Sequence, residues 1–373
     1  MADKGRLAQL GVDDAVLSLS LMALGNEDHK CIVAELSAPS AAADPSQLEP
    51  IASLLRSSGQ LPAAACKLTD TELARLVHRV RSNLHVSLDD ETASRPTGVG
   101  LYPEAALINH SCIPSACLSW RQAGRMLQVR AIVDLRAGEE VTCSYLAEQQ
   151  LYAPFAERAS LLREAFGFTP TEPRQRRAAE EATVAETRPS AALLRKAQQL
   201  LGATHGAANA ASAGTERLAS FVDAQLMGCV HPFHWIVQEA HTALLAAARA
   251  DGNGRAEDPH RVAKCALHLI AAREFTLPVG TLHLAALYAA HGSALCRVHR
   301  GCDDDDDELA SSQREELAAA AVRSLTAAHR IRCCCLGEDH PLSAMTAAAV
   351  QQVGHRGKAK ANELSVVRRP SCS

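Results

Sequence analysis

The sequence predicts an α+β protein in which a small β-rich block stands between a helical N-terminal segment and a helical C-terminal region. Two observations support this fold class. Apolar residues recur at helical spacing in much of the chain before residue 97 and in most of it after residue 216. Between these parts, residues 98–168 contain short runs typical of strands, separated by glycine-marked turns. With 373 residues, 47% of them apolar, the chain can bury a sizeable core in about two domains.

The N-terminal segment, residues 1–97, is expected to be mostly helical. Apolar positions compatible with helices occur in residues 12–24 and 47–56. Thr69 and Glu72 have the spacing of a capping box, in which two side chains each accept a hydrogen bond from the other residue's backbone amide. An apolar stripe follows at once, so we expect a helix to begin near residue 70.

The β-rich block is expected to span residues 98–168. Its strands are predicted at residues 116–120, 126–135 and 140–145, with glycines marking the turns between them. A helix should close the block, because Pro154 suits a first helical turn, where the missing amide of proline costs nothing.

Residues 169–215 are expected to form a linker region around a short helix, because their Pro-, Arg- and Glu-rich and Gly-, Ala- and Ser-rich stretches lack an apolar stripe. The next domain, residues 216–353, carries Ala- and Leu-rich segments that indicate stacked helical hairpins of a tetratricopeptide-like kind. Residues 354–373 are polar and basic, and we expect them to be disordered. Six helices are predicted in this domain, near residues 216–227, 232–250, 259–273, 279–298, 314–332 and 340–353.

The composition argues against two classes of partner. A formal net charge of −4 supplies no overall basic field for nucleic acid. No run of eighteen apolar residues is long enough to span a bilayer, and the first thirty residues lack a secretory signal. We therefore expect no direct nucleic-acid or membrane partner and a location in the cytoplasm, the nucleus or both. The 13 cysteines are expected to be mostly buried free thiols.

Three motifs, taken together in their order along the chain, indicate the function. They are Gly-Val-Gly-Leu-Tyr-Pro at 98–103, Asn-His-Ser-Cys-Ile-Pro at 109–114, and a Gly-Glu-Glu turn at 138–140 leading to Tyr145. Together they resemble the SET and MYND domain (SMYD) family of protein-lysine methyltransferases. The resemblance implies a SET block with a pseudoknot-like chain crossing, the cofactor S-adenosylmethionine, and a lysine of a histone or non-histone protein as substrate.

Two neighbouring polar residues are the first site candidates. The Asn109 amide supplies both a donor and an acceptor, as an adenine edge requires, and the two ring nitrogens of His110 can fix a backbone turn. An isolated pair of this kind is also common in a buried loop that satisfies its own backbone. The resemblance implies that both residues hold the adenosine end of S-adenosylmethionine.

Tyr145 is the candidate catalytic residue. A phenol with a pKa of about 10 is a poor base at neutral pH but a good hydrogen-bond organiser. The resemblance assigns Tyr145 the catalytic position, whereas a strand-terminal Tyr taken alone is commonly structural.

Three further residues match the family less closely. Residues 80–85 resemble a V-x-x-N-x-F segment, which makes Asn83 a candidate cofactor contact and places His85 where an aromatic ring walls the lysine channel. The end of a surface helix is an equal alternative for this segment. Phe168 falls where a ring packs against the adenine in the family, and it is equally compatible with a core position.

The chain also departs from the family pattern. Ser115 replaces an Asn, and Pro170, Glu172 and Gln175 stand where three zinc-binding cysteines of the post-SET segment are expected. Cys112 alone cannot form a four-ligand zinc site, so no metal is expected.

Only two cysteines, Cys31 and Cys66, precede the β-rich block, too few for a MYND zinc module, and the family's G-x-G hairpin is missing. A catalytically inactive SET-derived scaffold that binds protein partners through the helical domain is therefore the alternative function.

Overall fold

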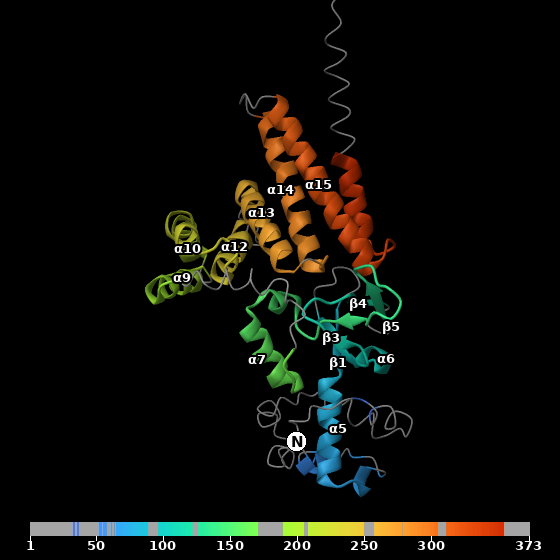
Figure 1. Ribbon diagram of the computed structural model, residues 1–373. Helices are drawn as coiled ribbons and strands as arrows, with labels where there is room; N and C mark the ends of the chain where they lie inside the picture. The colour runs from blue at the N-terminus through green and yellow to red at the C-terminus, as the bar shows by residue number, and fades with distance from the viewer. Residues whose placement is uncertain are drawn as a thin grey trace, which may run out of the picture. The chain divides into compact units, whose positions relative to one another are not determined.

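The computed structural model divides into two compact units, residues 1–171 and 172–373 (Figure 1). The expected helix at 12–24, the tail at 354–373 and most of the linker between 171 and 188 lie outside the described residues. The structure describes scattered positions between 33 and 63 and then residues 65–88, 96–121, 126–170, 189–204, 208–249, 257–277, 279–304 and 311–353.

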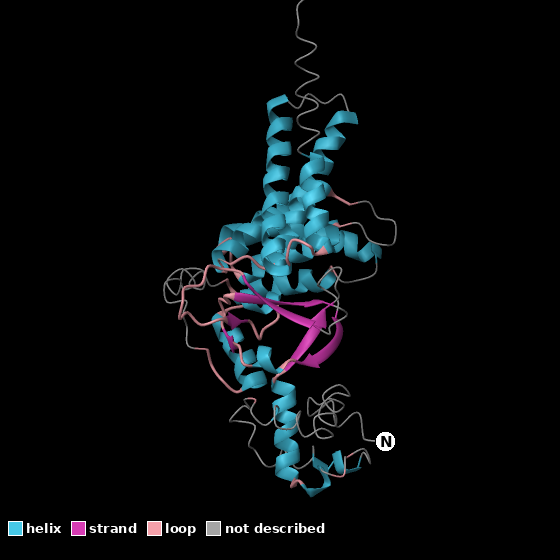
Figure 2. Ribbon diagram, turned by 90° about the vertical axis from the view of Figure 1, so that its right-hand side faces the viewer, coloured by secondary structure: helices cyan, strands magenta, loops and turns pink. Residues whose placement is uncertain are grey.

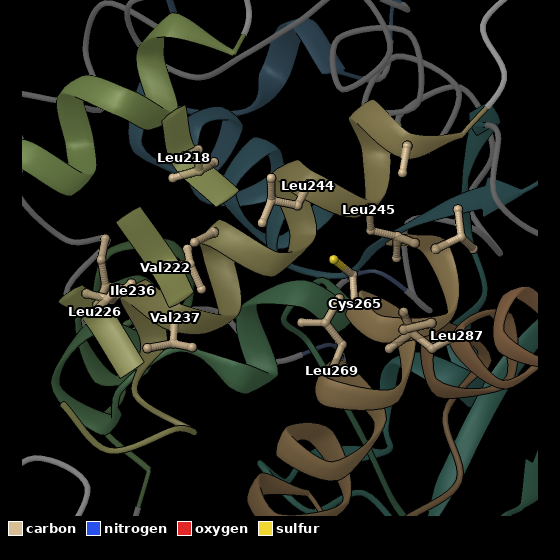
Figure 3. Packing of buried hydrophobic residues seen from close by; sticks show 14 of the residues in the cluster. Leu218, Val222, Leu226, Ile236, Val237, Leu244, Leu245, Cys265, Leu269 and Leu287 are labelled. Carbon is tan, nitrogen blue, oxygen red and sulfur yellow. The ribbon is translucent and has the colours of Figure 1, made fainter. Parts of the chain in front are cut away.

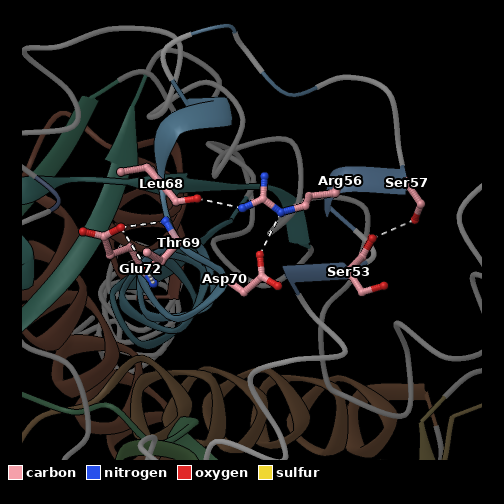
Figure 4. A network of polar contacts seen from close by, with 7 residues as sticks. All are labelled: Ser53, Arg56, Ser57, Leu68, Thr69, Asp70 and Glu72. Carbon is pink, nitrogen blue, oxygen red and sulfur yellow. Dashed lines mark hydrogen bonds and ion pairs between the residues drawn. The ribbon is translucent and has the colours of Figure 1, made fainter.

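Helix α5, Asp70–Ser82, follows the short helix η2, Ala65–Lys67, and confirms the predicted capping box. The Glu72 amide donates to the Thr69 hydroxyl at 3.3 Å, and the Thr69 amide donates to the Glu72 carboxylate at 2.7 Å. The Arg56 guanidinium joins this end of α5 to the preceding chain, since its Nε donates to Asp70 at 2.7 Å (Figure 4). The apolar face of α5 is buried, which explains why the helix forms here.

Three two-stranded sheets follow among the described residues and confirm the predicted α+β class (Figure 2). The first, which was not predicted, occupies residues 84–101, part of which was expected to be helical. The sheets pair β1, Leu84–Leu88, with β2, Pro96–Leu101; β3, Asn109–His110, with β6, Thr142–Cys143; and β4, Ala116–Arg121, with β5, Met126–Ala131. The first and last pairs are antiparallel and the second is parallel.

Two strands are shorter than predicted. Strand β5 ends at Ala131: the Ile132 amide still donates to the Ser115 carbonyl at 2.9 Å, but the Ser115 amide donates to the Thr142 carbonyl of β6 and not back to Ile132. Strand β6 covers only residues 142–143, since the Tyr145 amide donates to the His110 ring instead of to a neighbouring strand. The short helix α6, Pro103–Ala106, connects β2 to β3.

Helix α7, Phe155–Phe166, closes the β-rich block after the short helix η3, Glu148–Tyr152. Pro154 is the residue just before its first turn, and Gly167 ends it with a φ of 76°, a left-handed conformation that suits glycine. The buried face of α7 includes Leu162 and, unexpectedly, Arg158.

The second unit is helical, and each of the six predicted segments contains a helix. Helix α10 begins at residue 208, inside the expected linker, because an Ala-rich stretch favours helix. The helices are α9, Ala191–Ala203; α10, Ala208–Phe221, continued by the π-turn η5, Val222–Leu226, and by α11, Met227–Cys229; α12, Trp235–Ala248; α13, Pro259–Thr276; α14, Leu282–Asp304; α15, Ser311–Leu336; and a last helix over 341–353.

The core of this unit is built from the facing sides of α9 to α14. Leu218, Ile236 and Leu269 are fully buried in one continuous apolar cluster (Figure 3). Helices α14 and α15 also pack closely, and the His291 ring of α14 lies 2.8 Å from the Ser324 hydroxyl of α15. Packing of this kind, rather than helix propensity alone, stabilises such an array.

Gly292 of α14 leaves little room for extra volume against α15. A Cβ at residue 292 would lie 2.7 Å from Cγ of Leu325 and 3.0 Å from the Ala321 carbonyl oxygen. We expect Gly292→Ala to lower the free energy of unfolding by roughly 1–2 kcal/mol, because overpacking outweighs the gain in helix propensity. Gly202→Ala in α9, where a Cβ meets nothing within 4 Å, is the matched control and should cost no stability. Urea denaturation of both variants checks this, and equal midpoints would contradict it.

Candidate functional site

The candidate site forms where two segments far apart in the sequence lie side by side. Strands β3 and β6 pair in parallel, so His110 lies opposite Cys143. Beyond the strand pair, the Ser111 amide donates to the Cys143 carbonyl at 2.9 Å. These bonds hold residues 109–115, here called the Asn-His loop, against the strand that leads to Tyr145.

Ser115, which stands where the family pattern has an Asn, anchors the far end of the Asn-His loop. Its hydroxyl oxygen accepts a hydrogen bond from the Thr142 amide at 2.9 Å, and its own amide donates to the Thr142 carbonyl at 3.1 Å. A serine therefore maintains the contact between the loop and β6 at this position.

The His110 ring links the loop to the strand end. Its Nδ1 accepts a hydrogen bond from the Tyr145 amide at 3.0 Å, across 35 residues of sequence, and its Nε2 lies 3.4 Å from Sγ of Cys112. Burial, reinforced by the positive charge of Arg158, lowers the pKa of His110 to about 4. The imidazole is therefore neutral at physiological pH, which is the form that can accept from the Tyr145 amide.

The Tyr145 hydroxyl is held in one orientation. It donates to the Ile108 carbonyl at 2.8 Å. Burial raises the pKa of Tyr145 to about 12, and the nearby acidic groups of Cys143 and Glu140 add to the shift. The side chain therefore stays a phenol whose proton is committed to Ile108, so its oxygen is left as an acceptor.

Aromatic rings surround His110 and Tyr145. The rings of His110 and Phe168 lie 6.0 Å apart, and those of Tyr145 and Phe166 lie 5.0 Å apart, both at tilted angles. The Tyr145 and Phe168 rings meet edge to face at 6.2 Å. These distances are those of favourable ring pairs, and we call these four residues the aromatic cluster.

Asn109 lies at the edge of this arrangement with an exposed side chain. Its Nδ2 donates to Oε1 of Glu140 at 2.7 Å, which ties the first motif residue to the Gly-Glu-Glu turn. Sequence reasoning used this turn only as a family signature and missed the contact. The structure thus brings Asn109, His110, Tyr145 and Phe168 into one region.

Asn83 and His85 have described contacts with other residues than those around Tyr145. Asn83 ends α5, only 8% of it is exposed, and its Nδ2 donates to the Arg79 carbonyl at 2.7 Å. His85 lies on β1, and its ring meets the Tyr102 ring edge to face at 5.8 Å. Burial lowers the pKa of His85, so this ring too is neutral. The contacts described for these two residues are with α5, with β2, where His85 pairs with Gly100, and with Tyr102 just after it.

Arg158 is the residue of this region that sequence reasoning missed. Only 1% of it is exposed, its guanidinium donates to the Ala153 carbonyl, and its charge lies 5.8 Å from the centre of the Phe155 ring. The available signal was its place on the buried stripe of α7 with Ala159 and Leu162. A charged side chain is seldom buried on the apolar face of a helix without a partner, so this position could have marked Arg158 from the sequence.

Cys112 is buried beside His110 but does not form part of a metal-binding group. Throughout the described ranges, no three His, Cys, Asp or Glu side chains gather closely enough to hold an ion. Within the same ranges, no helix has the length and apolar character needed to cross a membrane.

Comparison with known proteins finds similarity over the part of the chain that contains most of this site. Residues 31–146 match the SET domain family. The chain is also 35% identical over 83 residues to the proteins named N-lysine methyltransferase SMYD2 of Homo sapiens, Bos taurus and Gallus gallus. The matched segment is 22% of this chain and spans 18% of the length of those relatives. Residues 31–146 are therefore similar to SET domains, and the 83-residue segment is similar to part of SMYD2, as the three motifs predicted. The chain spans less than a fifth of the length of these relatives.

The neutral state of His110 predicts a pH effect on stability. Between pH 6.5 and about 4 the unfolded chain binds a proton at this residue and the folded chain does not, so acid should destabilise the fold. Asn at position 110 keeps an acceptor for the Tyr145 amide but cannot titrate. We expect the free energy of unfolding of His110→Asn to fall less steeply over this range, as measured by urea denaturation at stepped pH.

Other buried histidines, such as His241 with a pKa of about 3, lower stability in acid in both proteins. The comparison therefore rests on the difference between the two slopes. Parallel slopes would show that His110 is not held neutral by the fold.

Proposed function

We propose that the protein is a protein-lysine N-methyltransferase that uses S-adenosylmethionine. The observation that supports this most directly is the Asn-His loop held against the strand end at Tyr145, with Phe168 beside both. The relatives named N-lysine methyltransferase match this chain over its SET region. The proposal places the protein in the cytoplasm, the nucleus or both, with protein substrates.

The residues present fit the adenosine part of the cofactor. An adenine needs a hydrogen-bonding edge and a flat apolar surface, and Asn109 and Phe168 offer these in one region. The neutral His110 fixes the loop that carries Asn109, and it adds no positive charge that would repel a sulfonium. We assign Asn109, His110 and Phe168 to cofactor binding, and Asn83 as a further contact from the end of α5.

The chemistry of methyl transfer assigns a role to Tyr145. When bound, S-adenosylmethionine supplies an electrophilic methyl group on a positively charged sulfur. The substrate lysine must present a neutral amine in line with that methyl group, so orientation and removal of water provide most of the acceleration. Because the Tyr145 hydroxyl proton is committed to the Ile108 carbonyl, the phenol oxygen can accept an N–H of the amine and orient it. His85 is assigned to the wall of the lysine channel.

A methyl-transfer assay tests the proposed function. The full chain is incubated with S-adenosylmethionine labelled in its methyl group and with a library of histone and non-histone lysine peptides. Incorporation on lysine that depends on Asn109 supports the enzyme, as checked by mass spectrometry of the product. Absence of transfer to every peptide and to a whole-cell protein extract, by a chain shown to be folded, would overturn it.

A non-catalytic SET-derived scaffold is the second candidate. It is favoured by one specific feature, the replacement of three post-SET cysteines by Pro170, Glu172 and Gln175. Without these zinc ligands, a lid over the cofactor would depend on packing. A folded chain that binds protein partners through its helical unit but not S-adenosylmethionine would favour the scaffold.

A further inference from the structure

The helical unit contains a cleft of about 470 Å³ that the proposed methyl transfer does not use. Its walls come from four helices: Arg249 follows α12, Glu257 precedes α13, Arg297 is on α14 and Arg332 is on α15. This volume falls in the range of sites that hold small molecules. The cleft lies wholly within the helical unit, so its chemistry can be read from these helices alone.

Positive charge exceeds negative charge in this cleft. Three arginines and one glutamate line it, and the Arg297 guanidinium forms an ion pair with Glu257. Among the described residues, no acidic side chain forms an ion pair with Arg249 or Arg332. Two cationic side chains therefore line the cleft with no ion-pair partner among the described residues, beside one glutamate that is paired with Arg297.

Arg332 is the more deeply placed of the two. Only 8% of it is exposed, and its Nη1 donates to the Thr346 hydroxyl and, at 3.5 Å, towards the Leu342 carbonyl. Both acceptors are neutral, so they orient the guanidinium without compensating its charge. Burial lowers the pKa of Arg332, which reflects the cost of holding a cation away from water. An anion in the cleft would offset that cost.

Apart from Arg297, the wall supplied by α14 is made of small side chains. Ala286, Ala289 and Ala290 leave the volume of the cleft open, and Ser293 adds one hydroxyl to the lining. An apolar surface with a few polar groups at its rim is the usual make-up of a small-molecule site. The body of a ligand would meet methyl groups while its charged end met the arginines.

We propose that this cleft binds a small organic anion whose carboxylate or phosphate group lies between Arg249 and Arg332 and whose less polar part covers the alanines of α14. Arginine suits this role because its planar fork can donate two parallel hydrogen bonds to either anionic group. All the residues that carry this proposal belong to the helical unit.

Ala286 allows a test with two variants of similar size, one charged and one neutral. Its side chain lines the cleft and is exposed, so a longer residue there need not disturb the core. Calorimetric titration of the full chain with citrate and, separately, with inorganic phosphate should show saturable binding of at least one anion. Ala286→Glu should weaken that binding about tenfold by placing a carboxylate in the cleft, whereas the neutral, similarly sized Ala286→Gln should stay within about twofold.

A second pair of variants tests the cation. Arg249→Gln should weaken binding by a similar factor, and Arg323→Gln, which changes an exposed arginine of α15 outside the cleft, should not. Binding of citrate only or of phosphate only identifies the anionic group. Absence of binding by both anions, or equal binding by Ala286→Glu and Ala286→Gln, would overturn the proposal.

Discussion

Replacing Tyr145 by Phe is expected to lower kcat for lysine methylation about 100-fold while leaving the chain folded. The substitution removes one hydroxyl, which donates to the Ile108 carbonyl at 2.8 Å and orients the incoming amine in the proposed mechanism. The ring contacts with Phe166 and Phe168 remain, so the cost in folding stability should be only about 1 kcal/mol. Steady-state methylation at saturating cofactor measures the effect.

The matched control for this experiment is Tyr288→Phe in the helical unit, which removes a hydroxyl that donates to Glu274. Its kcat should equal that of the unchanged protein. If Tyr145→Phe also methylates at the unchanged rate, the catalytic role of Tyr145 is wrong, whatever its effect on stability.

Arg158→Ala is expected to give the largest loss of folding stability in the SET block, roughly 3 kcal/mol in the free energy of unfolding. The substitution empties the volume of a long side chain that is only 1% exposed and leaves the Ala153 carbonyl without its described guanidinium donor. Burying a cation is costly, so part of the lost packing is offset when the charge goes. Guanidinium chloride unfolding, followed by circular dichroism, gives the value.

Arg163→Ala is the matched control because it removes the same residue type from an exposed position of α7. It should change stability by about 0.5 kcal/mol or less. Similar losses for the two variants would show that Arg158 is not a buried support of α7. In Arg158→Ala the pKa of His110 should also rise, since a neighbouring cation that lowers it is gone.

Local sequence patterns predicted local structure well. The capping box at Thr69 and Glu72 and the apolar stripes of the helical unit depend on residues within a few positions of one another, so they can be identified from the sequence alone. The strand ends could not be predicted this way. The end of β6 depends on a hydrogen bond between Tyr145 and His110 that spans 35 residues, and no short window contains it.

In the candidate site, too, the residues could be predicted but their long-range contacts could not. The ordered motifs indicated Asn109, His110 and Tyr145, and a separate match to the family indicated Phe168. The structure groups the rings of His110, Tyr145 and Phe168, with Asn109 next to His110 on β3. The residues that contact them could not be predicted from the sequence pattern. The Asn109 contact with Glu140 joins segments that are 31 residues apart. The effect of the Arg158 charge on His110 depends on how α7 packs. Local periodicity encodes neither of these.

Calorimetric titration of the full chain with S-adenosylmethionine is the most direct test of the account. We predict micromolar binding that is lost in Asn109→Ala and kept in Tyr145→Phe, because the first change removes a cofactor contact and the second only the hydroxyl that orients the amine. Absence of binding by the folded, unchanged chain, or equal binding by Asn109→Ala, would contradict the proposed cofactor site.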